Sequence, residues 1–317
     1  MNKKVKVFAP VSIGNVSVGF DSLGLALTPI DGQMLGDVVI IKSTEGDSHF
    51  VLKGRYASRL PDDPERNVVW QIRSTFEAAL QQQGITPQPM VIKLKKHIPV
   101  CSGLGSSACS VVAALVALNA FYDQPFDQQT LLRMMGEAEA TISGSVHFDN
   151  VAPSFLGGMQ LMLSEAEQVA VSVPLFEDIY WVLAYPDVLV STQAARERLP
   201  QQYDRSTLIR FGQNLAGFVS ACYRQDADLA FALLKDEVAE PYRAELLPNF
   251  NQTKQQLLRM GSLAAGISGS GPTLFSACDD LVTAQAQAVW LKQHYLQSDD
   301  GFVAICQADT EGARILS

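Results

Sequence analysis

Residues typical of disulfide frameworks and metal sites are scarce in this chain of 317 residues. It has four histidines, and its five cysteines, at positions 101, 109, 222, 278 and 306, form no CxxC pair. An odd number of widely spaced cysteines indicates neither a disulfide framework nor a zinc site. We therefore expect free thiols and a reducing, cytoplasmic location.

Long apolar runs are missing as well. No segment approaches about 18 uninterrupted apolar residues, and the start MNKKVKVFAPV lacks the apolar core of a secretory signal. We therefore expect neither a membrane-spanning segment nor export.

Positive charge is in short supply. Lysine and arginine number 24 against 33 acidic residues, which gives a formal net charge of −9. This balance disfavours nucleic acid or an anionic membrane as a partner. A polyanionic ligand would have to be held locally, by backbone N–H groups and a few cationic side chains.

The chain does have the composition of a globular protein, with 47% hydrophobic and 18% charged residues. Its length suits two ordinary domains, and a change in composition near Val173-Pro174 predicts domains at 1–173 and 174–317. Hydrophobic periodicity predicts strands at 4–10, 37–43, 49–53, 90–98, 179–186 and 302–307, and helices at 68–82, 205–223, 226–237, 249–260 and 281–296. This order of elements favours an α+β second domain.

The segment PVCSGLGSSACSVVAALVALNA, residues 99–120, joins a turn of small residues to an apolar helix. Small side chains leave backbone N–H groups uncovered, and Gly103 and Gly105 tolerate positive φ. We expect the helix to begin at Ala108, so that its first-turn N–H groups and positive dipole end face the turn. This strand, turn and helix predict an anion site suited to phosphate.

Other interpretations of this turn stay open on local grounds. The GxxxxGK[ST] phosphate loop is absent, but the looser dinucleotide fingerprint matches as Gly103-x-Gly105-x-x-Ala108, with Asp123 as its acidic residue. The turn is also compatible with simple packing of a helix on a sheet. Two adjacent serines at the helix start argue against that last interpretation, because their hydroxyls can hold a metal ion as well as cap the helix.

Two more glycine-rich segments lie towards the ends of the chain. VSIGNVSVGFDSLGLALT, residues 11–28, carries Asn15 and Asp21, which either bond their own backbone in turns or face a ligand. AAGISGSGPTLFSAC, residues 264–278, contains Gly266, Gly269 and Pro272, which we expect to bar regular structure and to form a functional loop.

Candidate acid–base residues lie between these segments. His147, Asp149 and Asn150 cluster in a turn, where a His-x-Asp pair is compatible with a structural or an acid–base role. Glu137 and Glu139 are two positions apart on a predicted helix and point in different directions. At most one of the two is therefore expected to face a site.

Taken in order, PVSIGNVSVGFDSLGLAL, PVCSGLGSSAC and AAGISGSGPTLFS resemble the three signature motifs of the GHMP kinases, the family of galactokinase, homoserine, mevalonate and phosphomevalonate kinases. The resemblance covers the whole chain. It implies a two-domain α+β fold, with an N-terminal ATP-binding α/β domain of the ribosomal-protein type at 1–173 and a C-terminal, ferredoxin-like substrate-binding domain at 174–317. It also implies an ATP-dependent phosphotransferase that uses Mg²⁺.

The resemblance assigns the glycine-serine turn to the nucleotide. ATP would contact Asn67, near the adenine, and the turn residues Pro99, Val100, Cys101, Ser102, Gly103, Leu104, Gly105, Ser106, Ser107, Ala108 and Cys109. Ser107 and Glu139 match the positions that hold Mg²⁺ in the family, which selects Glu139 over Glu137.

Four further segments, GFDSLGLAL, SGSVHFDNVAPSFLGG, STQAARERLP and EPYRAELLP, resemble the family members that phosphorylate an amino acid. They imply L-homoserine as the second substrate. Asn15 and Asp21 match positions that contact its hydroxyl and ammonium, and Arg196 and Arg243 match its carboxylate clamp, a division that suits the charges of a free amino acid. The same pocket would include His147, Asp149, Thr192 and Gly269.

Asn150 stands where mevalonate kinase-like relatives have a catalytic aspartate, and an amide cannot accept the proton. The predicted catalytic residues are therefore Asn15, Ser107, Glu139 and Asn150, acting by direct in-line transfer without a dedicated base. Three alternatives stay open: a family kinase for another substrate such as mevalonate, a nicotinamide-dependent dehydrogenase, and a non-catalytic amino-acid sensor. The sequence does not fix the oligomeric state, and a homodimer stays open.

Overall fold

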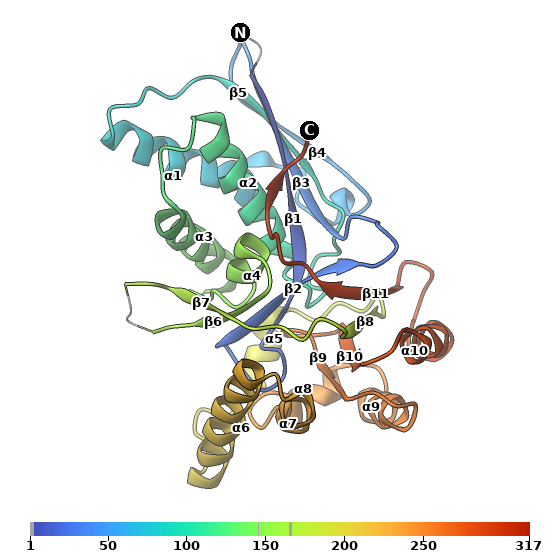
Figure 1. Ribbon diagram of the computed structural model, residues 1–317. Helices are drawn as coiled ribbons and strands as arrows, with labels where there is room; N and C mark the ends of the chain where they lie inside the picture. The colour runs from blue at the N-terminus through green and yellow to red at the C-terminus, as the bar shows by residue number, and fades with distance from the viewer. Residues whose placement is uncertain (1–2, 145, 165–166) are drawn as a thin grey trace.

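The computed structural model describes residues 3–144, 146–164 and 167–317 (Figure 1). Its strands are β1 (Lys4–Gly14), β2 (Leu23–Pro29), β3 (Gly36–Ser43), β4 (His49–Lys53), β5 (Met90–Lys95), β6 (Met159–Met162), β7 (Ala170–Val173), β8 (Tyr180–Tyr185), β9 (Ala264–Ile267), β10 (Leu274–Cys278), β11 (Phe302–Ala308) and β12 (Arg314–Ile315). They join in the order β4-β5-β3-β1-β2-β11-β8-β10-β9, with β12 beside β1, β6 beside β2 and β7 beside β6. β4 and β5 are parallel, and the other described pairs are antiparallel.

The helices are α1 (Val68–Gln82), α2 (Ser106–Phe121), α3 (Gln128–Ser143), α4 (Val151–Leu156), α5 (Thr192–Glu197), α6 (Arg205–Arg224), α7 (Ala227–Leu233), α8 (Glu240–Arg243), α9 (Phe250–Arg259) and α10 (Leu281–His294), with short 3-10 turns η1 (Ala57–Arg59), η2 (Pro64–Arg66) and η3 (Ala244–Leu246). In Figure 1, α1 to α4 gather on one side of the upper strands, and α6 to α10 surround the lower ones. The mixture of helices and strands confirms the predicted α+β class.

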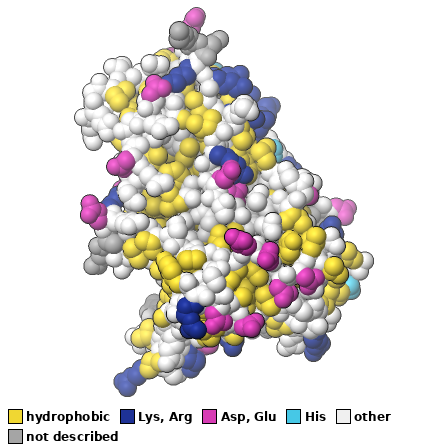
Figure 2. All heavy atoms as spheres, in the orientation of Figure 1, with side chains coloured by type: hydrophobic (Ala, Val, Ile, Leu, Met, Phe, Trp, Pro, Cys, Tyr) yellow, Lys and Arg dark blue, Asp and Glu magenta, His cyan; other side chains and the backbone are white. Residues whose placement is uncertain are grey.

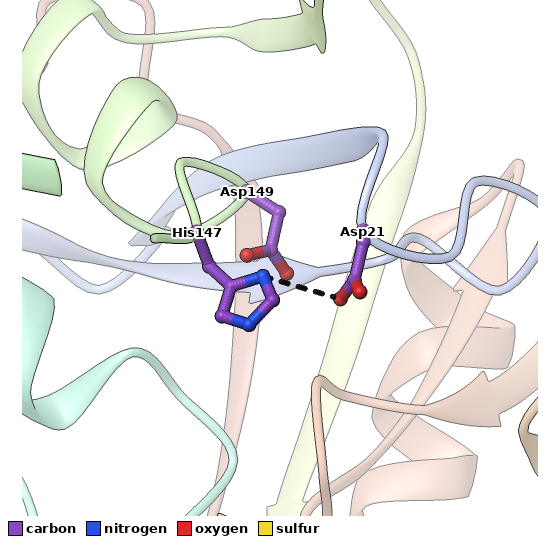
Figure 3. A group of neighbouring side chains, drawn as sticks. All are labelled: Asp21, His147 and Asp149. Atoms are coloured by element: carbon purple, nitrogen blue, oxygen red, sulfur yellow. Dashed lines mark ion pairs between the residues drawn. The ribbon is translucent and has the colours of Figure 1, made fainter. Parts of the chain in front are cut away.

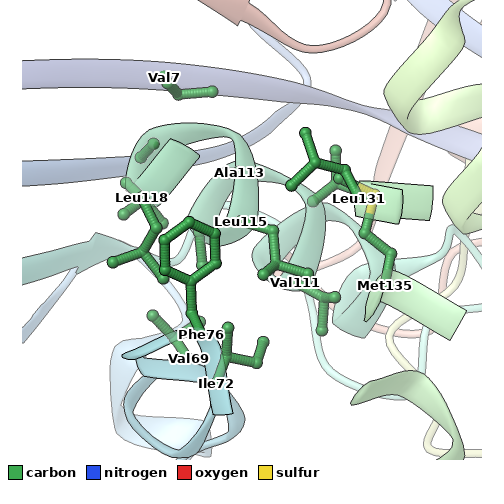
Figure 4. Close-up of a cluster of buried hydrophobic side chains, with 14 of the residues drawn as sticks. Val7, Val69, Ile72, Phe76, Val111, Ala113, Leu115, Leu118, Leu131 and Met135 are labelled. Carbon is green, nitrogen blue, oxygen red and sulfur yellow. The ribbon is translucent and has the colours of Figure 1, made fainter. Parts of the chain in front are cut away.

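Helix α2 is the centre of the upper core. Its alanine, valine and leucine residues occupy every side of the helix, and such a helix must be buried on all sides. It packs on β1 and β3 and against α1 and α3, where Val111, Leu115 and Leu118 meet Phe76 and Met135 (Figure 4). The turn that precedes α2 is therefore attached to the most firmly packed element of this half.

The two halves of the chain share their sheet. β11 pairs with β2, aligning Cys306 with Pro29, and β12 pairs with β1. The predicted boundary after Val173 coincides with the end of β7, although the division into 1–173 and 174–317 stays a prediction.

On the face drawn in Figure 2, acidic side chains are concentrated over the lower part of the molecule. Among the described helices, none combines the length and the apolar character needed to cross a membrane.

Several predicted boundaries were wrong. Residues 11–14 and 23–28 belong to β1 and β2, so that only 15–22 form the first glycine-rich loop, and Gly266 lies in β9 rather than in a loop. Gly14 and Gly24 are aligned in the β1–β2 ladder, so these glycines lie in paired strands. Gly24 also packs closely, since a Cβ there would lie 1.8 Å from the carbonyl oxygen of Asp149. Helix α2 begins at Ser106, two residues earlier than expected, and α7 is shorter than the predicted 226–237.

Candidate active site

A cavity of about 280 Å³ is lined by residues from both halves of the chain. The predicted site residues that line it are Asn15, Asp21, Asn67, Val100, Cys101, Ser102, Gly103, Gly105, Ser106, Ser107, Glu139, His147, Asp149, Asn150, Thr192, Arg196, Arg243 and Gly269. Four predicted nucleotide contacts, Pro99, Leu104, Ala108 and Cys109, are buried behind the turn instead of lining this cavity. Their place in the structure suits support of the turn rather than contact with a ligand.

The loop between β9 and β10 is bonded to the glycine-serine turn. Ser268 Oγ donates a hydrogen bond to the Gly103 carbonyl at 2.6 Å, and the Thr273 N–H donates to the Ser102 carbonyl at 3.2 Å. The two backbones lie so close that a Cβ at Gly103 would be 2.5 Å from the Ser268 carbonyl oxygen. Glycine is therefore required at 103 by the neighbouring loop as well as by its positive φ of 78°.

The same loop is bonded to the first glycine-rich loop, so all three motifs meet. Asn15 Nδ2 donates to the Gly269 carbonyl at 3.1 Å, and the Gly269 N–H donates to the Gly14 carbonyl at 3.1 Å. Asn15 Oδ1 also accepts from the Asp21 N–H at 2.9 Å, so Asn15 both orders its own loop and lines the cavity. Val16, a buried β-branched residue, has a φ of 45°, a strained conformation that needs this dense bonding around it.

The N-terminus of α2 faces this cavity without a side-chain cap. Its N-cap residue, Gly105, is left-handed with a φ of 62° and, being a glycine, offers no side-chain cap to the first-turn N–H groups. A Cβ at Gly105 would lie 2.6 Å from Ser12 Oγ, which explains why a capping residue with a side chain is absent. The first-turn N–H groups and the positive end of the helix are therefore available to an anion.

A buried ion pair, which the sequence analysis did not identify, supports this turn. Lys96, only 2% exposed, donates from Nζ to Asp37 Oδ2 at 2.5 Å and to the Ser106 carbonyl at 2.6 Å. It also donates to Ser110 Oγ at 3.0 Å, while Asp37 Oδ1 accepts from the His97 N–H at 2.8 Å. The pair thus connects the end of β5 with the first turn of α2.

Ser107 and Glu139 form the predicted metal-binding pair. Ser107 Oγ donates to Glu139 Oε1 at 2.5 Å. Burial raises the pKa of Glu139, while the Ser107 hydroxyl and Lys96 act in the opposite direction. A hydroxyl and a carboxylate side by side are the hard oxygen ligands that Mg²⁺ prefers, so the donor set fits this ion. Glu137, by contrast, is exposed and lines a separate groove between α1 and α3.

Asp21, His147 and Asp149 converge on the other end of the cavity (Figure 3). Their ligand atoms all lie within 4.8 Å of one another, and His147 Nδ1 is 3.7 Å from Asp21 Oδ1. Burial raises the pKa of Asp149 to about 7, with the carboxylates of Asp21 and Glu139 adding to the effect. Burial also lowers the pKa of His147. This end is therefore acidic and partly desolvated.

Asn150 is held in place beside this acidic group. Its amide nitrogen donates to Asp149 Oδ2 at 3.3 Å, and its amide oxygen accepts from Ser12 Oγ at 3.0 Å. Both ends of the amide are therefore fixed, and the side chain lies between the acidic group and the start of α2.

Two arginines offset this negative charge. Arg196 Nη2 donates to both carboxylate oxygens of Asp21, each at 3.0 Å. Arg243 is 3% exposed and donates to the carbonyls of Ala195 and Gly269, from Nε at 3.1 Å and Nη1 at 3.2 Å. Within the part of the chain that the structure describes, its Nη2 has no hydrogen-bond partner and is available to a ligand. Burial lowers the pKa of Arg243.

Some cavity residues were missed by the sequence analysis. They are Leu60, Arg66, Val68, Leu94, Lys96, Ser110, Ile142 and Ser270. Lys96 is the one lysine of this run on the apolar face, because alternation from Ile92 and Leu94 places it on the side that the structure buries. The sequence analysis did not use this signal. Ser270 adjoins the predicted Gly269, and its hydroxyl is 3.5 Å from Thr192 Oγ1.

Family models match both halves of this chain. The model of the GHMP kinase N-terminal domain matches residues 67–158, and the model of the GHMP kinase C-terminal domain matches residues 218–295. Together these matches cover more than half of the chain. The chain belongs to the GHMP kinases.

Solved structures agree with this membership. A homoserine kinase from Cytophaga hutchinsonii is 32% identical, with a TM-score of 0.90, and the match covers 100% of this chain and 98% of that one. A putative homoserine kinase from Listeria monocytogenes is 23% identical with a TM-score of 0.73 and coverage of 99% and 100%. The mevalonate kinase of Methanococcus jannaschii, 13% identical with a TM-score of 0.69 and coverage of 97% and 98%, shares the fold.

Membership in this family makes the protein a small-molecule kinase that uses ATP. The resemblance drawn from the three glycine-rich motifs is thereby confirmed. The dinucleotide interpretation loses its acidic residue, because Asp123 follows the far end of α2, where it pairs with Lys3 at 2.7 Å.

Proposed function

We propose that this GHMP kinase transfers the γ-phosphoryl group of ATP to the side-chain hydroxyl of L-homoserine, forming O-phospho-L-homoserine and ADP. One observation carries the proposal: a single cavity has uncapped helix N–H groups at one end and two arginines with an aspartate at the other. A free amino acid presents a carboxylate and an ammonium group close together, and this charged end complements both. The 32% identical homoserine kinase supports the same choice.

At the nucleotide end, the phosphates would bind the first-turn N–H groups of α2. Asn67 caps α1, since its Oδ1 accepts from the Val69 N–H at 3.0 Å, so its amide nitrogen is the part left to face the adenine. Ser107 and Glu139 would hold Mg²⁺, which neutralises charge on the β- and γ-phosphates when it is bound.

At the amino-acid end, the carboxylate would bind Arg243 Nη2 and Arg196, and the ammonium group would bind Asp21. Asp21 and Arg196 already pair with each other, so the substrate would share an existing pair of opposite charges rather than neutralise isolated ones. His147, Asp149, Thr192 and Gly269 would complete the pocket, and Asn15 would contact the hydroxyl.

The transfer itself would proceed in line, through positioning and charge stabilisation, without a dedicated base. Asn150 cannot take the hydroxyl proton, because neither the nitrogen nor the oxygen of an amide is basic enough, although the oxygen accepts a hydrogen bond from Ser12. The proton would pass to the transferred phosphate or to solvent.

A substitution at Asn150 tests this last point. A positioned base contributes roughly 10²- to 10⁴-fold, so we expect Asn150→Ala to lower kcat by much less than that, within about tenfold. Single-turnover measurement of phosphoryl transfer, with binding of Mg·ATP checked by titration, gives the result. A loss of several hundredfold with nucleotide binding intact would show that a proton relay runs through this position.

The proposed function is tested by ADP release from purified protein with Mg·ATP and a panel of acceptors. We expect turnover with L-homoserine that exceeds turnover with mevalonate by orders of magnitude. Preference for mevalonate would assign the chain to another branch of the family, and binding of homoserine without any ADP release would identify an amino-acid sensor.

A further inference from the structure

One aromatic ring lies against both arginines of the amino-acid end. The guanidinium carbon of Arg243 is 5.3 Å from the centroid of the Phe20 ring, and that of Arg196 is 5.7 Å from it. Both distances are within the range of cation–π attraction. The three residues come from the first glycine-rich loop, α5 and α8, so the ring joins elements from both halves of the chain.

Phe20 has no evident role in the core. It is half-buried, and the three apolar clusters formed by the described residues do not contain it. Nor does it line the cavity, which Asp21, the next residue, does line. Its position behind the arginines therefore suits a contact with these two side chains rather than with substrate or core.

The contact with the ring matters most for Arg196. Arg243 is fixed by two carbonyl oxygens, but Arg196 is hydrogen-bonded, within the described residues, to Asp21. Under the proposed function the substrate ammonium group draws on the same Asp21 carboxylate. Arg196 would then lose part of its hydrogen bonding at the moment when it has to bind the substrate carboxylate. The negative face of the ring also lessens repulsion between two like charges held close together.

We infer that Phe20 is a positioning residue that holds Arg196 and Arg243 together as one carboxylate-binding unit. This inference rests on the proposed function. It assigns to the first glycine-rich loop a second task besides presenting Asn15 and Asp21, because the loop also orders the side chains that recognise the other charge of the amino acid.

Steady-state kinetics of Phe20→Leu, with Phe20→Tyr as the conservative variant, tests the inference. Leucine keeps an apolar side chain but removes the ring, so we expect KM for L-homoserine to rise about 5- to 30-fold, a size that follows from two cation–π contacts. KM for ATP and kcat should stay within about twofold, and Phe20→Tyr should restore most of the affinity. Phe50→Leu, in a half-buried phenylalanine of β4 that contacts Trp70, is the matched control and should leave every KM unchanged.

A truncated substrate separates positioning of the arginines from a general loosening of the loop. 3-Aminopropan-1-ol is homoserine without its carboxylate, so it cannot use the arginines. We therefore expect Phe20→Leu and wild type to have nearly the same kcat/KM for this acceptor. If Phe20→Leu lowers kcat/KM for both acceptors by the same factor, or leaves KM for homoserine unchanged, the inference is wrong. Failure of the proposed function would be distinct, since the wild-type protein would then not phosphorylate homoserine.

Discussion

The two ends of the cavity are built in different ways. The end proposed to bind nucleotide consists largely of backbone from one continuous segment, 96–110, supported by buried α2 and by the Lys96–Asp37 pair. The amino-acid end consists of charged side chains from distant segments, among them Asp21, Asp149 and Arg243. Backbone N–H groups have a direction fixed by the helix, whereas charged side chains need partners to stay in place. The first end should therefore depend on what lies beneath it, and the second on pairing within it.

The largest effect is expected beneath the nucleotide end. Lys96→Met leaves Asp37 as an uncompensated buried charge, and we expect a loss in the free energy of unfolding of about 3–5 kcal/mol. Urea unfolding followed by circular dichroism measures it. The double variant Lys96→Met/Asp37→Leu should recover only part of the loss, because it removes both charges but also removes the acceptor of the His97 and Ile98 N–H groups. A single variant within about 1 kcal/mol of wild type would contradict the dependence of this end on its support.

The metal pair comes next in size. Glu139→Gln removes the carboxylate beside Ser107, and we expect kcat to fall by about 10²- to 10³-fold, since a lost metal ligand removes several kcal/mol of charge stabilisation. The apparent affinity for Mg²⁺ should fall with it. Glu137→Gln, two residues away and in a different groove, is the matched control and should stay within about twofold of wild type. A larger fall in kcat for Glu137→Gln than for Glu139→Gln would overturn the assignment of Glu139 as the metal ligand.

At the amino-acid end, the two arginines should differ. Arg243→Ala should lower kcat/KM for homoserine by about 10²-fold, because its guanidinium is buried and supplies a charged hydrogen bond. Arg196→Ala should lower kcat/KM for homoserine by about tenfold, a smaller effect because the Arg196 side chain is 37% exposed. ATP binding by titration should stay near that of wild type in both variants. If the two variants lost affinity for ATP and kept affinity for homoserine, the assignment of the arginines to the amino acid would be wrong.

The last prediction concerns pH and stability rather than catalysis. Burial raises the pKa of Asp149 to about 7, well above that of an aspartate in an unfolded chain. Between pH 5 and pH 7 the folded protein therefore holds a proton that the unfolded chain has released, so this group lowers stability as pH rises, by about 2 kcal/mol over that window. Asp149→Asn should lack this term, and its stability relative to wild type should increase from pH 5 to pH 7. Parallel profiles for the two proteins would show that Asp149 is not desolvated.

The difference between the two ends of the cavity also explains which parts of the site could be predicted from the sequence. The anion site followed from 99–120 alone, because a turn of small residues and the helix after it are contiguous. Helix α1 and strand β4 also have the predicted bounds, since their periodicity is local. The charged end could not be derived in this way: Asp21 and Arg196 are 175 positions apart, and each alone looks like a surface residue. The resemblance to a family supplied these residues. The burial of Lys96 follows the alternation of its strand, but its pairing with Asp37 and the contact of Phe20 with two arginines depend on packing between segments distant in the sequence.

We propose that phosphate and amino acid occupy opposite ends of one cavity. A crystal structure with a non-hydrolysable ATP analogue, Mg²⁺ and L-homoserine tests it most directly. We expect phosphate oxygens on the N–H groups at the start of α2, the homoserine carboxylate on Arg196 and Arg243, and the homoserine hydroxyl directed at the γ-phosphorus. A nucleotide bound away from the glycine-serine turn, or a homoserine carboxylate that contacts neither arginine, would contradict it.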